Sequence, residues 1–263
     1  MARLLDFNQS TKATAASTTV TFTATDVPGD AVIAYLLDFT GAGMTAGDLT
    51  RIRIKAGGNQ IWDVDFNHYA AWYERYSFSN RAPAAADTAM TLPLFLPGLR
   101  SEEDADRSQF PRGAAPSLEL VIGAGGAVGT VTCHWVRTTT PAQFYPAFLG
   151  NVLNWSAVTN NNRYPLTEAG AIKAVAINTT GLTRGRLELA GVKRFEASGV
   201  GLIESQRFDT PATLSNPIVW DMAGPGLGGG QVATPGNSAV YGDVGAAWAG
   251  VANEVAVYAI RGQ

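Results

Sequence analysis

The segment LTRIRIKAGGNQIW, residues Leu49–Trp62, occurs a second time in altered form as LTRGRLELAGVKRF, residues Leu182–Phe195. Both copies begin with Leu-Thr-Arg, continue with alternating apolar and charged residues, turn at a glycine and end on an aromatic residue. Alternation with a period of two predicts strands with one buried face, and the turn glycines, Gly58 and Gly191, predict a tight connection. The repeated segment therefore predicts two related β-hairpins.

Matching segments flank both hairpins in the same order. The further pairs are YLLDFTG (35–41) with VAINTTG (175–181), LPLFLPGL (92–99) with NPIVWDMAGPGL (216–227), and VTCHWVR (131–137) with VAVYAIR (255–261). Only the first copy has the extra loop AGMTAGD (42–48). The prolines of the second pair predict strands at sheet edges. We therefore expect a duplicated unit, with domains 1–140 and 141–263 that meet near Thr140 and Pro141.

The composition favours an all-β globular chain. Of 263 residues, 46% are hydrophobic and 16% are charged, with 29 glycines and 13 prolines, which suits short strands joined by turns. The formal net charge of -3 argues against nucleic acid as a direct partner, because phosphate binding needs clustered Lys and Arg.

The single cysteine, Cys133, excludes an intrachain disulfide. The start MARLLDFNQS lacks the apolar run of a secretory signal, so we expect folding in a cytosol. A membrane-spanning helix needs about 18 consecutive apolar residues, and we expect none in this sequence.

Few helices are expected. The best candidate is Asn67–Tyr76, in which aromatic residues recur at helical spacing behind a possible N-cap at Asn67. Its counterpart in the second copy is the weaker pattern GLIESQRF (201–208). FYPAFLGNVLNW (144–155) is a second possible helix, although it contains a proline and a glycine.

The stretch from Asp63 to Glu74 partly matches a calcium-binding EF-hand loop, with Asp63, Asp65, Asn67 and Glu74 at ligand positions. His68 occupies the position that requires glycine, and a predicted hairpin precedes the stretch in place of a helix. We therefore interpret the carboxylates as the solvated side of a strand that leads into a helix. An adventitious calcium ion, or one at a subunit seam near Asp63 and Asp65, remains the alternative.

Three further motifs have a structural interpretation. VIGAGGAVG (121–129) resembles a dinucleotide-binding loop, but the segment after it alternates like a strand, so we expect a hairpin loop. GPGLGGG (224–230) lacks the end of a phosphate loop and is expected to be a surface loop. The acidic run SEEDADR (101–107) is expected to be solvated, in preference to a carboxylate pair for glycoside hydrolysis.

The chain has only two histidines, His68 and His134, and Tyr258 replaces His134 in the second copy. Cys133 shares one strand face with Val131 and Trp135, as a small buried hydrophobic residue would. We therefore predict no catalytic, cofactor-binding or metal-binding residues, and the chain is not expected to be an enzyme.

With its tandem Leu-Thr-Arg hairpins, each followed by a glycine turn and an aromatic, and the short helix at YAAWYERY (69–76), the chain resembles a viral family. It is similar to the double jelly-roll major capsid proteins of tailless icosahedral bacteriophages, particularly the corticovirus-like phages with an internal membrane. The resemblance extends from the strand near Val20 to VAVYAIRG (255–262). It implies an all-β fold of two tandem jelly-roll β-barrels with one or two short helices.

The resemblance also implies a function and partners. Such proteins form homotrimers that act as pseudo-hexagonal capsomers and tile the shell of a virion, which is assembled in the host cytoplasm. Neighbouring capsomers, vertex and minor capsid proteins, and an internal membrane or its proteins are the implied partners. The short loops and the lack of a long N-terminal arm depart from larger members. Residues Arg3, Leu4, Leu5 and Phe7 could contact lipid, but an ordinary first strand is favoured.

The alternative function is a tandem β-sandwich carbohydrate-binding protein, such as a lectin or phage fibre. In that case, exposed Trp62, Trp72 or Trp155 would serve as platforms for sugar rings. An enzyme is the third choice, because the sequence offers no credible set of catalytic residues.

Overall fold

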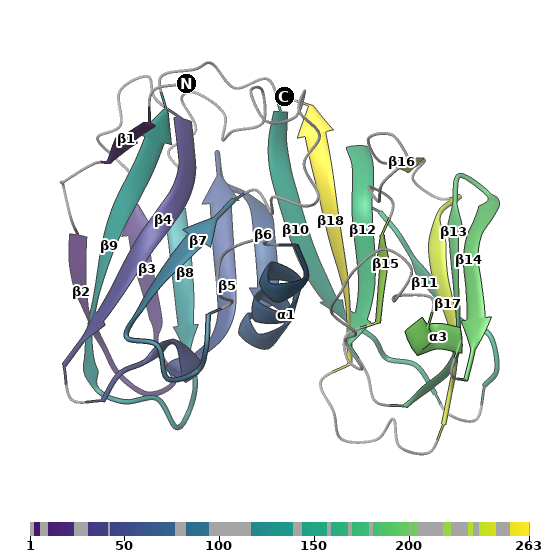
Figure 1. The fold of residues 1–263 in the computed structure, drawn as a ribbon, viewed down its shortest axis with the longest axis horizontal. Coiled ribbons are helices and arrows are strands. Elements are labelled where there is room, and N and C mark those ends of the chain that lie inside the picture. Colours follow the sequence, from purple (N-terminus) through teal and green to yellow (C-terminus); the bar gives the residue numbers. More distant parts are fainter. Residues whose placement is uncertain are drawn as a thin grey trace. The chain divides into compact units, whose positions relative to one another are not determined.

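The structure is a computed structural model that describes residues 3–5, 10–23, 31–41, 43–76, 83–94, 117–138, 144–156, 159–167, 170–178, 181–199, 201–204, 218–221, 231–233, 237–245 and 253–262. These residues form mainly β-strands (Figure 1). The chain divides into unit 1, residues 1–147 with 262–263, and unit 2, residues 148–261. The predicted boundary near Thr140 and Pro141 lies outside the described residues, and the domain limits derived from the sequence stay a prediction.

Unit 1 consists of two β-sheets and a short helix. Its elements are β1 (Arg3–Leu5), β2 (Ser10–Thr14), β3 (Thr19–Thr23), β4 (Ala31–Thr40), the 3-10 turn η1 (Ala46–Asp48), β5 (Leu49–Ala56), β6 (Asn59–Asp65), α1 (Phe66–Tyr76), β7 (Ala89–Pro93), β8 (Ser117–Ile122) and β9 (Gly129–Thr138). Sheet 1A has the order β1-β9-β4-β7, with β2 also paired to β9. Sheet 1B has the order β6-β5-β8-β3.

Unit 2 is also built from two β-sheets. Its elements are β10 (Phe144–Val152), β11 (Asn162–Pro165), β12 (Gly170–Asn178), β13 (Leu182–Leu189), β14 (Val192–Ser198), α3 (Gly201–Glu204), β15 (Ile218–Asp221), β16 (Gln231–Ala233), β17 (Ala239–Val244) and β18 (Glu254–Gly262). The first four residues of β10 and the last residue of β18 fall within the limits of unit 1. Sheet 2A has the order β10-β18-β12-β15, with β16 also paired to β12. Sheet 2B has the order β14-β13-β17-β11.

The two units have the same topology. Strands β2 to β9 of unit 1 have the same neighbours as β10, β11, β12, β13, β14, β15, β17 and β18 of unit 2, in that order. In unit 1, helix α1 lies between β6 and the edge strand β7. In unit 2, helix α3 lies at the corresponding place, between β14 and the edge strand β15. Two antiparallel sheets connected in this way form a jelly roll. The prediction of two tandem jelly rolls with short helices is confirmed, and β7 and β15 are edge strands, as their prolines indicated.

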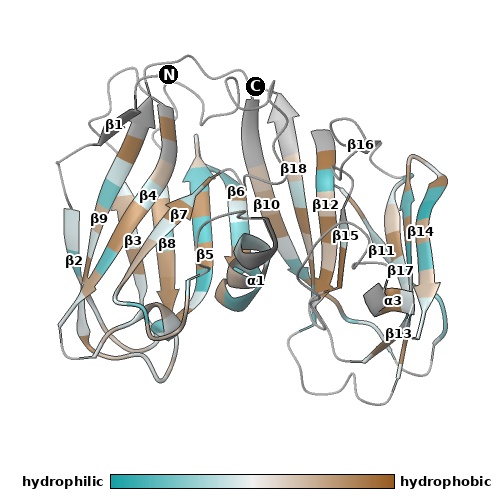
Figure 2. Cartoon of the chain, viewed as in Figure 1, coloured by the Kyte–Doolittle hydropathy of each residue, from teal (hydrophilic) through white to brown (hydrophobic). Residues whose placement is uncertain are grey.

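Alternating burial builds the core of each unit. Along β5, Ile52 and Ile54 are buried, whereas Arg51 and Arg53 on the other face are half-buried. The same alternation of hydrophobic and hydrophilic residues is visible on β5 in Figure 2. In unit 2, residues of both sheets meet in one cluster that includes Val175, Leu187, Trp220, Val240 and Val257. Each sheet therefore has one face in the core and one outer face whose residues are not fixed by packing in that core.

Two glycines make room for tryptophan side chains in the core of unit 2. Gly185 on β13 and Gly242 on β17 are partners in the strand register, and both are buried. A Cβ atom at Gly185 would lie 2.7 Å from the Trp220 ring, and one at Gly242 would overlap Trp155. Contacts this close are not tolerated between carbon atoms. The glycines are therefore required by the two indole rings.

Unit 1 fills the same positions differently. The partners that correspond to Gly185 and Gly242 are Ile52 and Leu120, which face each other across β5 and β8. Both have buried side chains. The two jelly rolls thus use the same backbone with a different distribution of side-chain volume.

The hairpin turns of the two repeats also correspond. Gly57 and Gly58 have φ of 58° and 82°, and Ala190 and Gly191 have φ of 52° and 75°. Two consecutive positive φ angles define the turn type that matches the twist of a two-residue hairpin. Ala190 is an alanine in the left-handed region, which costs a residue with a Cβ about 1 kcal/mol.

We predict that Ala190→Gly stabilises the chain by about 1 kcal/mol, because glycine adopts positive φ without steric cost. The matched control is Gly57→Ala in unit 1, which introduces the same conflict and should destabilise by a similar amount. Chemical denaturation of both variants measures the two changes in the free energy of unfolding. Changes of the same sign in both variants would contradict the assigned turn geometry.

The predicted helix near residues 67–76 is confirmed as α1, but its N-cap differs. The Asp65 carboxylate accepts hydrogen bonds from the backbone N–H groups of Asn67 at 2.8 Å and His68 at 3.3 Å. Asp65 is therefore the N-cap, and Asn67 lies inside the first turn, because the helix begins at Phe66. In the second copy, only Gly201–Glu204 forms a helix among the described residues.

The prediction of a helix at 144–155 is wrong, because residues Phe144–Val152 form strand β10. Hydrogen bonds to β18, which is distant in sequence, override the weak helical spacing. The expected hairpin loop at 121–129 is also wrong. β8 belongs to sheet 1B and β9 to sheet 1A, so this glycine-rich loop crosses between sheets.

The extra loop of the first copy is ordered around η1. Met44 is buried, and the Thr14 hydroxyl donates a hydrogen bond to its sulfur at 3.0 Å. The carboxylate of Asp48 accepts from the N–H of Thr45 at 2.8 Å and from the N–H of Ala127 at 3.2 Å. This loop therefore joins the end of β2 to the connection between β8 and β9. The segments 101–107 and 224–230 lie outside the described residues.

Candidate assembly surfaces

The acidic residues of the calcium-like stretch have partners within the protein. The Asp63 carboxylate accepts a hydrogen bond from Arg51 Nε, and Arg53 Nε lies 3.3 Å from the same oxygen. Asp65 caps α1, and the side chain of Glu74 lies outside the described residues. Within the described ranges, no three His, Cys, Asp or Glu side chains are grouped so that they could hold a metal ion. Asp63 lies on β6, which leads into α1, so the interpretation as a strand before a helix is confirmed.

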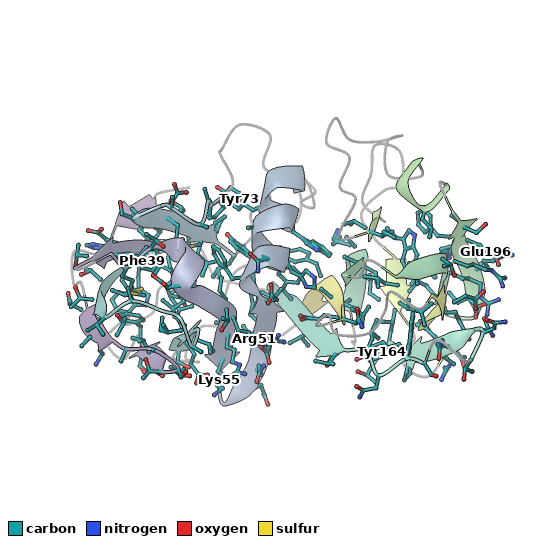
Figure 3. The ribbon with its side chains drawn as sticks, turned by 90° about the horizontal axis from the view of Figure 1, so that it is seen from below. Phe39, Arg51, Lys55, Tyr73, Tyr164 and Glu196 are labelled. Carbon is teal, nitrogen blue, oxygen red and sulfur yellow. The ribbon has the colours of Figure 1, made fainter. Side chains whose placement is uncertain are left out.

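The outer face of sheet 1B is a ladder of paired charges. Besides the Arg51–Asp63 and Arg53–Asp63 pairs, Lys55 Nζ lies 2.6 Å from Glu119 Oε1. Arg51 and Lys55 lie along one outer surface of unit 1 (Figure 3). Because opposite charges alternate across neighbouring strands, this face is close to neutral while remaining hydrated.

Sheet 2B carries an equivalent ladder. Arg184 and Glu196 each lie 133 residues after Arg51 and Asp63 (184 − 51 and 196 − 63), and Arg184 Nε donates to Glu196 Oε1 at 3.1 Å. Arg184 also lies 3.6 Å from Asp243. Glu196 is at the surface of unit 2 (Figure 3). The central ion pair of the repeated hairpin is thus present in both copies.

Arg186 is held from two directions on the same face. Its Nε lies 3.2 Å from Glu188 Oε1, and its guanidinium carbon lies 4.1 Å from the centre of the Tyr241 ring. A guanidinium over an aromatic face gains a cation–π attraction in addition to its ion pair. The charges of sheets 1B and 2B are therefore largely satisfied within their own sheets.

The hydrogen bonds from Lys193, followed by those from Arg184, lower the pKa of Glu196 from 4.5 to about 2. A lowered carboxylate pKa in the folded state adds stability above the unfolded pKa, and this contribution is lost as the pH falls through the folded pKa. The stabilising effect of Glu196 is therefore complete above about pH 4.5 and disappears toward pH 2.

We predict that Glu196→Gln lowers the thermal midpoint at neutral pH, because glutamine cannot form the ion pairs. The difference from the unsubstituted protein should shrink between about pH 4.5 and pH 2. Thermal unfolding followed by circular dichroism over this range measures the difference. A difference that stays constant down to pH 2 would contradict the assigned pairing.

The two histidines lie on different elements of unit 1. His68 is buried in α1, whereas Cys133 and His134 are neighbours on β9 with opposite orientations. Cys133 is fully buried with Val131 and Trp135, as predicted, and burial raises the pKa of its thiol to about 12. A thiol with a raised pKa carries little of the reactive thiolate at neutral pH.

We predict that Cys133 resists alkylation by iodoacetamide in the folded protein and reacts fully in denaturant. The buried thiol is neither accessible nor ionised, so labelling requires opening of unit 1. Mass spectrometry of samples quenched over time follows the reaction. Equal labelling rates in native and denaturing buffer would show that the thiol is exposed.

The outer face of sheet 1A has a different character from the charged ladders. We call it the threonine face. Its described outward side chains that are at least partly exposed are Thr11, Ala13, Leu36, Asp38, Thr40, Ala89, Thr91, Pro93, Thr130, Thr132, His134 and Val136. Ala34 lies on the same face, opposite Val136, and is buried at 8% exposure. Among these described side chains, only Asp38 carries a formal charge with histidine neutral.

The corresponding face of sheet 2A is buried. Ala176, Ala256 and Tyr258 occupy the positions of Leu36, His134 and Val136, and each is at most 1% exposed. The register therefore shifts the predicted match of Tyr258 with His134 by two residues, and Glu254, at the position of Thr132, is 4% exposed. The Tyr258 ring packs edge-on against Phe148 at 5.6 Å. Two equivalent sheet faces of one chain therefore differ in exposure and in composition.

Of the three tryptophans considered as sugar platforms, Trp62 and Trp72 are fully buried and Trp155 is partly buried. Trp62 and Trp72 are both 0% exposed, and Trp155 packs against the core of unit 2. The prediction that Trp62 or Trp72 could present an open aromatic ring is wrong, because both rings are needed in the core around α1. The carbohydrate-binding alternative is therefore not favoured.

The N-terminal strand β1 pairs with β9, with Arg3 opposite Thr138 and Leu5 opposite Val136. This pairing agrees with an ordinary first strand, and Phe7 lies outside the described residues. Among the described helices, none combines the length and the apolar character that a membrane span requires.

The fold is found in solved structures of viral capsid proteins. The major capsid protein P2 of bacteriophage PM2 has 13% sequence identity and a TM-score of 0.70, with 97% of each chain covered. For the STIV major capsid protein, identity is 11%, TM-score 0.65, and coverage 99% of this chain and 96% of that one. A capsid chain of PBCV-1 virus has 13% identity and a TM-score of 0.57, covering 99% of this chain and 94% of its own.

The sequence matches no protein-family model and no curated protein. At such low identity the structural comparison establishes the fold. The chain therefore has the double jelly-roll fold seen in viral major capsid proteins.

Proposed function

We propose that this chain is the major capsid protein of a tailless icosahedral virus and that it acts as a structural protein without enzymatic turnover. The observation that supports this most directly is the match to the PM2 major capsid protein over 97% of both chains. A match to one jelly roll alone would be weak support, because jelly rolls serve many functions. The match to two of them in tandem, at nearly the same chain length, is far more specific.

Self-assembly follows from the duplicated architecture. Three chains with two jelly rolls each would form a homotrimer with six similar units, which is a pseudo-hexagonal capsomer. The two units share a topology but differ in their outer faces, so the capsomer can have nearly six-fold surroundings and still make two kinds of contact. Capsomers of this kind would tile an icosahedral shell.

The remaining partners follow from that role. Neighbouring capsomers would contact the trimer at its rim, and vertex and minor capsid proteins would complete the shell. An internal membrane or its proteins would lie beneath it. The protein would be found in the virion after assembly in the host cytoplasm. The net charge of -3 supports a shell without direct contact to nucleic acid.

We predict that the purified chain forms a stable trimer of its 27.6 kDa subunit. Size-exclusion chromatography with light scattering measures the mass, and electron microscopy of the same fractions should show pseudo-hexagonal particles. A stable monomer that binds glycans would contradict the proposal and support the carbohydrate-binding alternative.

A further inference from the structure

Strand β3 forms an open edge of sheet 1B. Its one paired neighbour is β8, and in the described part of the chain no strand lies along its other side. We propose that this edge is a docking site for an extended peptide segment of another protein, which adds to sheet 1B as a further strand. The inference goes beyond the proposed function, because it assigns a partner-binding site to one strand of unit 1 and holds whether or not the chain builds a shell.

The backbone groups on the open side of β3 belong to threonines. The N–H of Ile122 donates to the carbonyl of Thr18 at 2.8 Å, which makes these two residues a hydrogen-bonded pair of the antiparallel ladder. Such pairs alternate with pairs whose backbone groups point away from each other. In the continuous register of β3 with β8, the N–H and C=O groups of Thr19, Thr21 and Thr23 therefore point away from β8.

This pattern selects the kind of partner. The open N–H and C=O groups recur at every second residue, which is a spacing of about 6.8 Å in an antiparallel strand. An extended peptide has the same repeat and can pair with all of these groups, as in strand addition to an exposed sheet edge. A helix uses its backbone groups internally and cannot form such a ladder. The side chains of the three threonines are exposed, so this stretch of the chain is accessible.

Among the described edge strands, β3 alone lacks protection against such pairing. Proteins protect sheet edges with charged residues, prolines, bulges or very short strands. β3 has the sequence TVTFT and pairs with β8 without a register shift. The other strands with one paired neighbour each have a protective feature: Arg3 on β1, Lys12 on β2, Pro93 on β7, Arg163 and Pro165 on β11, Lys193, Arg194 and Glu196 on β14, Asp221 on β15, and a length of three residues in β16. The one unprotected edge is therefore the one suited to a partner strand.

A groove beside this edge offers a place for side chains of the peptide. It has a volume of about 430 Å³ and is lined by residues 12–15, at the end of β2, and 18–21, at the start of β3. The side chains of an added strand alternate between the two faces of sheet 1B, so every second one faces the inner side, where the groove lies. In strand addition, backbone hydrogen bonds supply affinity and such pockets select side chains.

Lys12 determines which charge the groove accepts. It is the one charged residue among those that line the groove, and its side chain is exposed. The other lining residues are alanines, threonines and one valine. A carboxylate is the group that pairs most strongly with an ammonium ion. The expected peptide therefore presents β-branched or apolar side chains to the groove and a carboxylate near Lys12.

The decisive experiment removes one open backbone donor. The probe is a fluorescent peptide of alternating valine and threonine with one central glutamate, and fluorescence anisotropy measures its binding to the full chain. Thr21→Pro removes the central N–H on the open side of β3 and leaves the hydrogen bonds to β8 in place. We expect it to weaken binding by roughly tenfold or more. Thr21→Val is the matched control, because it keeps the N–H and the preference for a strand, and it should bind the probe unchanged.

Two further measurements test the ladder and the charge. A probe that is N-methylated along its whole backbone has no donors and should not bind, and this result decides the outcome if Thr21→Pro does not fold. Lys12→Glu should weaken binding of the glutamate probe by roughly threefold and strengthen binding of a probe with lysine in its place, as expected for an exposed ion pair. Circular dichroism confirms that each variant is folded.

The outcomes separate this inference from the proposed function. Binding that is lost with Thr21→Pro and kept with Thr21→Val supports the inference, whereas equal binding to both variants, or no binding to the unsubstituted chain, overturns it. If Thr21→Pro lowers the mass measured by light scattering, a second copy pairs with the edge and the inferred partner is wrong. A trimer that does not bind the probe overturns this inference alone, and a monomer that binds it overturns the proposed function alone.

Discussion

Burial of one face of each sheet against the other is the constraint on which both jelly rolls depend. Because side chains alternate along a strand, the same residues that place Ile52 and Ile54 in the core place Arg51 and Arg53 outside. The inner faces are limited by packing, and the outer faces are limited only by what surrounds them. Differences between the two copies can therefore collect on the outer faces without disturbing the fold.

The outer faces have diverged in two directions. The sheets with the repeated hairpins keep paired charges, which suits a surface that stays in water. Sheet 1A instead carries threonines with paired hydroxyls, whereas the outer face of its counterpart sheet 2A is buried and includes Ala176, Ala256 and Tyr258. A protein that functions through contacts, without chemistry at one site, would be expected to show this kind of division. In such a protein, the specificity of a contact depends on the composition of a whole sheet face and not on a few residues at one site.

The sequence was sufficient for features that depend on local periodicity. The repeated hairpins, the edge strands and α1 could be predicted because each leaves a pattern within about ten residues. Strand β10 and the crossover at 121–129 could not, because both depend on pairing with distant strands. The start of α1 was displaced by two residues, since Asp65 and Asn67 are both good caps and only the structure shows which one accepts the bonds. The threonine face required the register of β2, β4 and β9, which no local pattern contains.

The glycine pair of unit 2 has a consequence for folding. Two similar repeats in one chain can exchange strands while they fold, and such mispairing is a common fate of tandem domains. Here a strand carrying Gly185 would leave a void opposite Leu120, and a strand carrying Ile52 would collide with Trp220. The mismatch in side-chain volume therefore favours pairing of each strand within its own jelly roll over pairing with the corresponding strands of the other jelly roll.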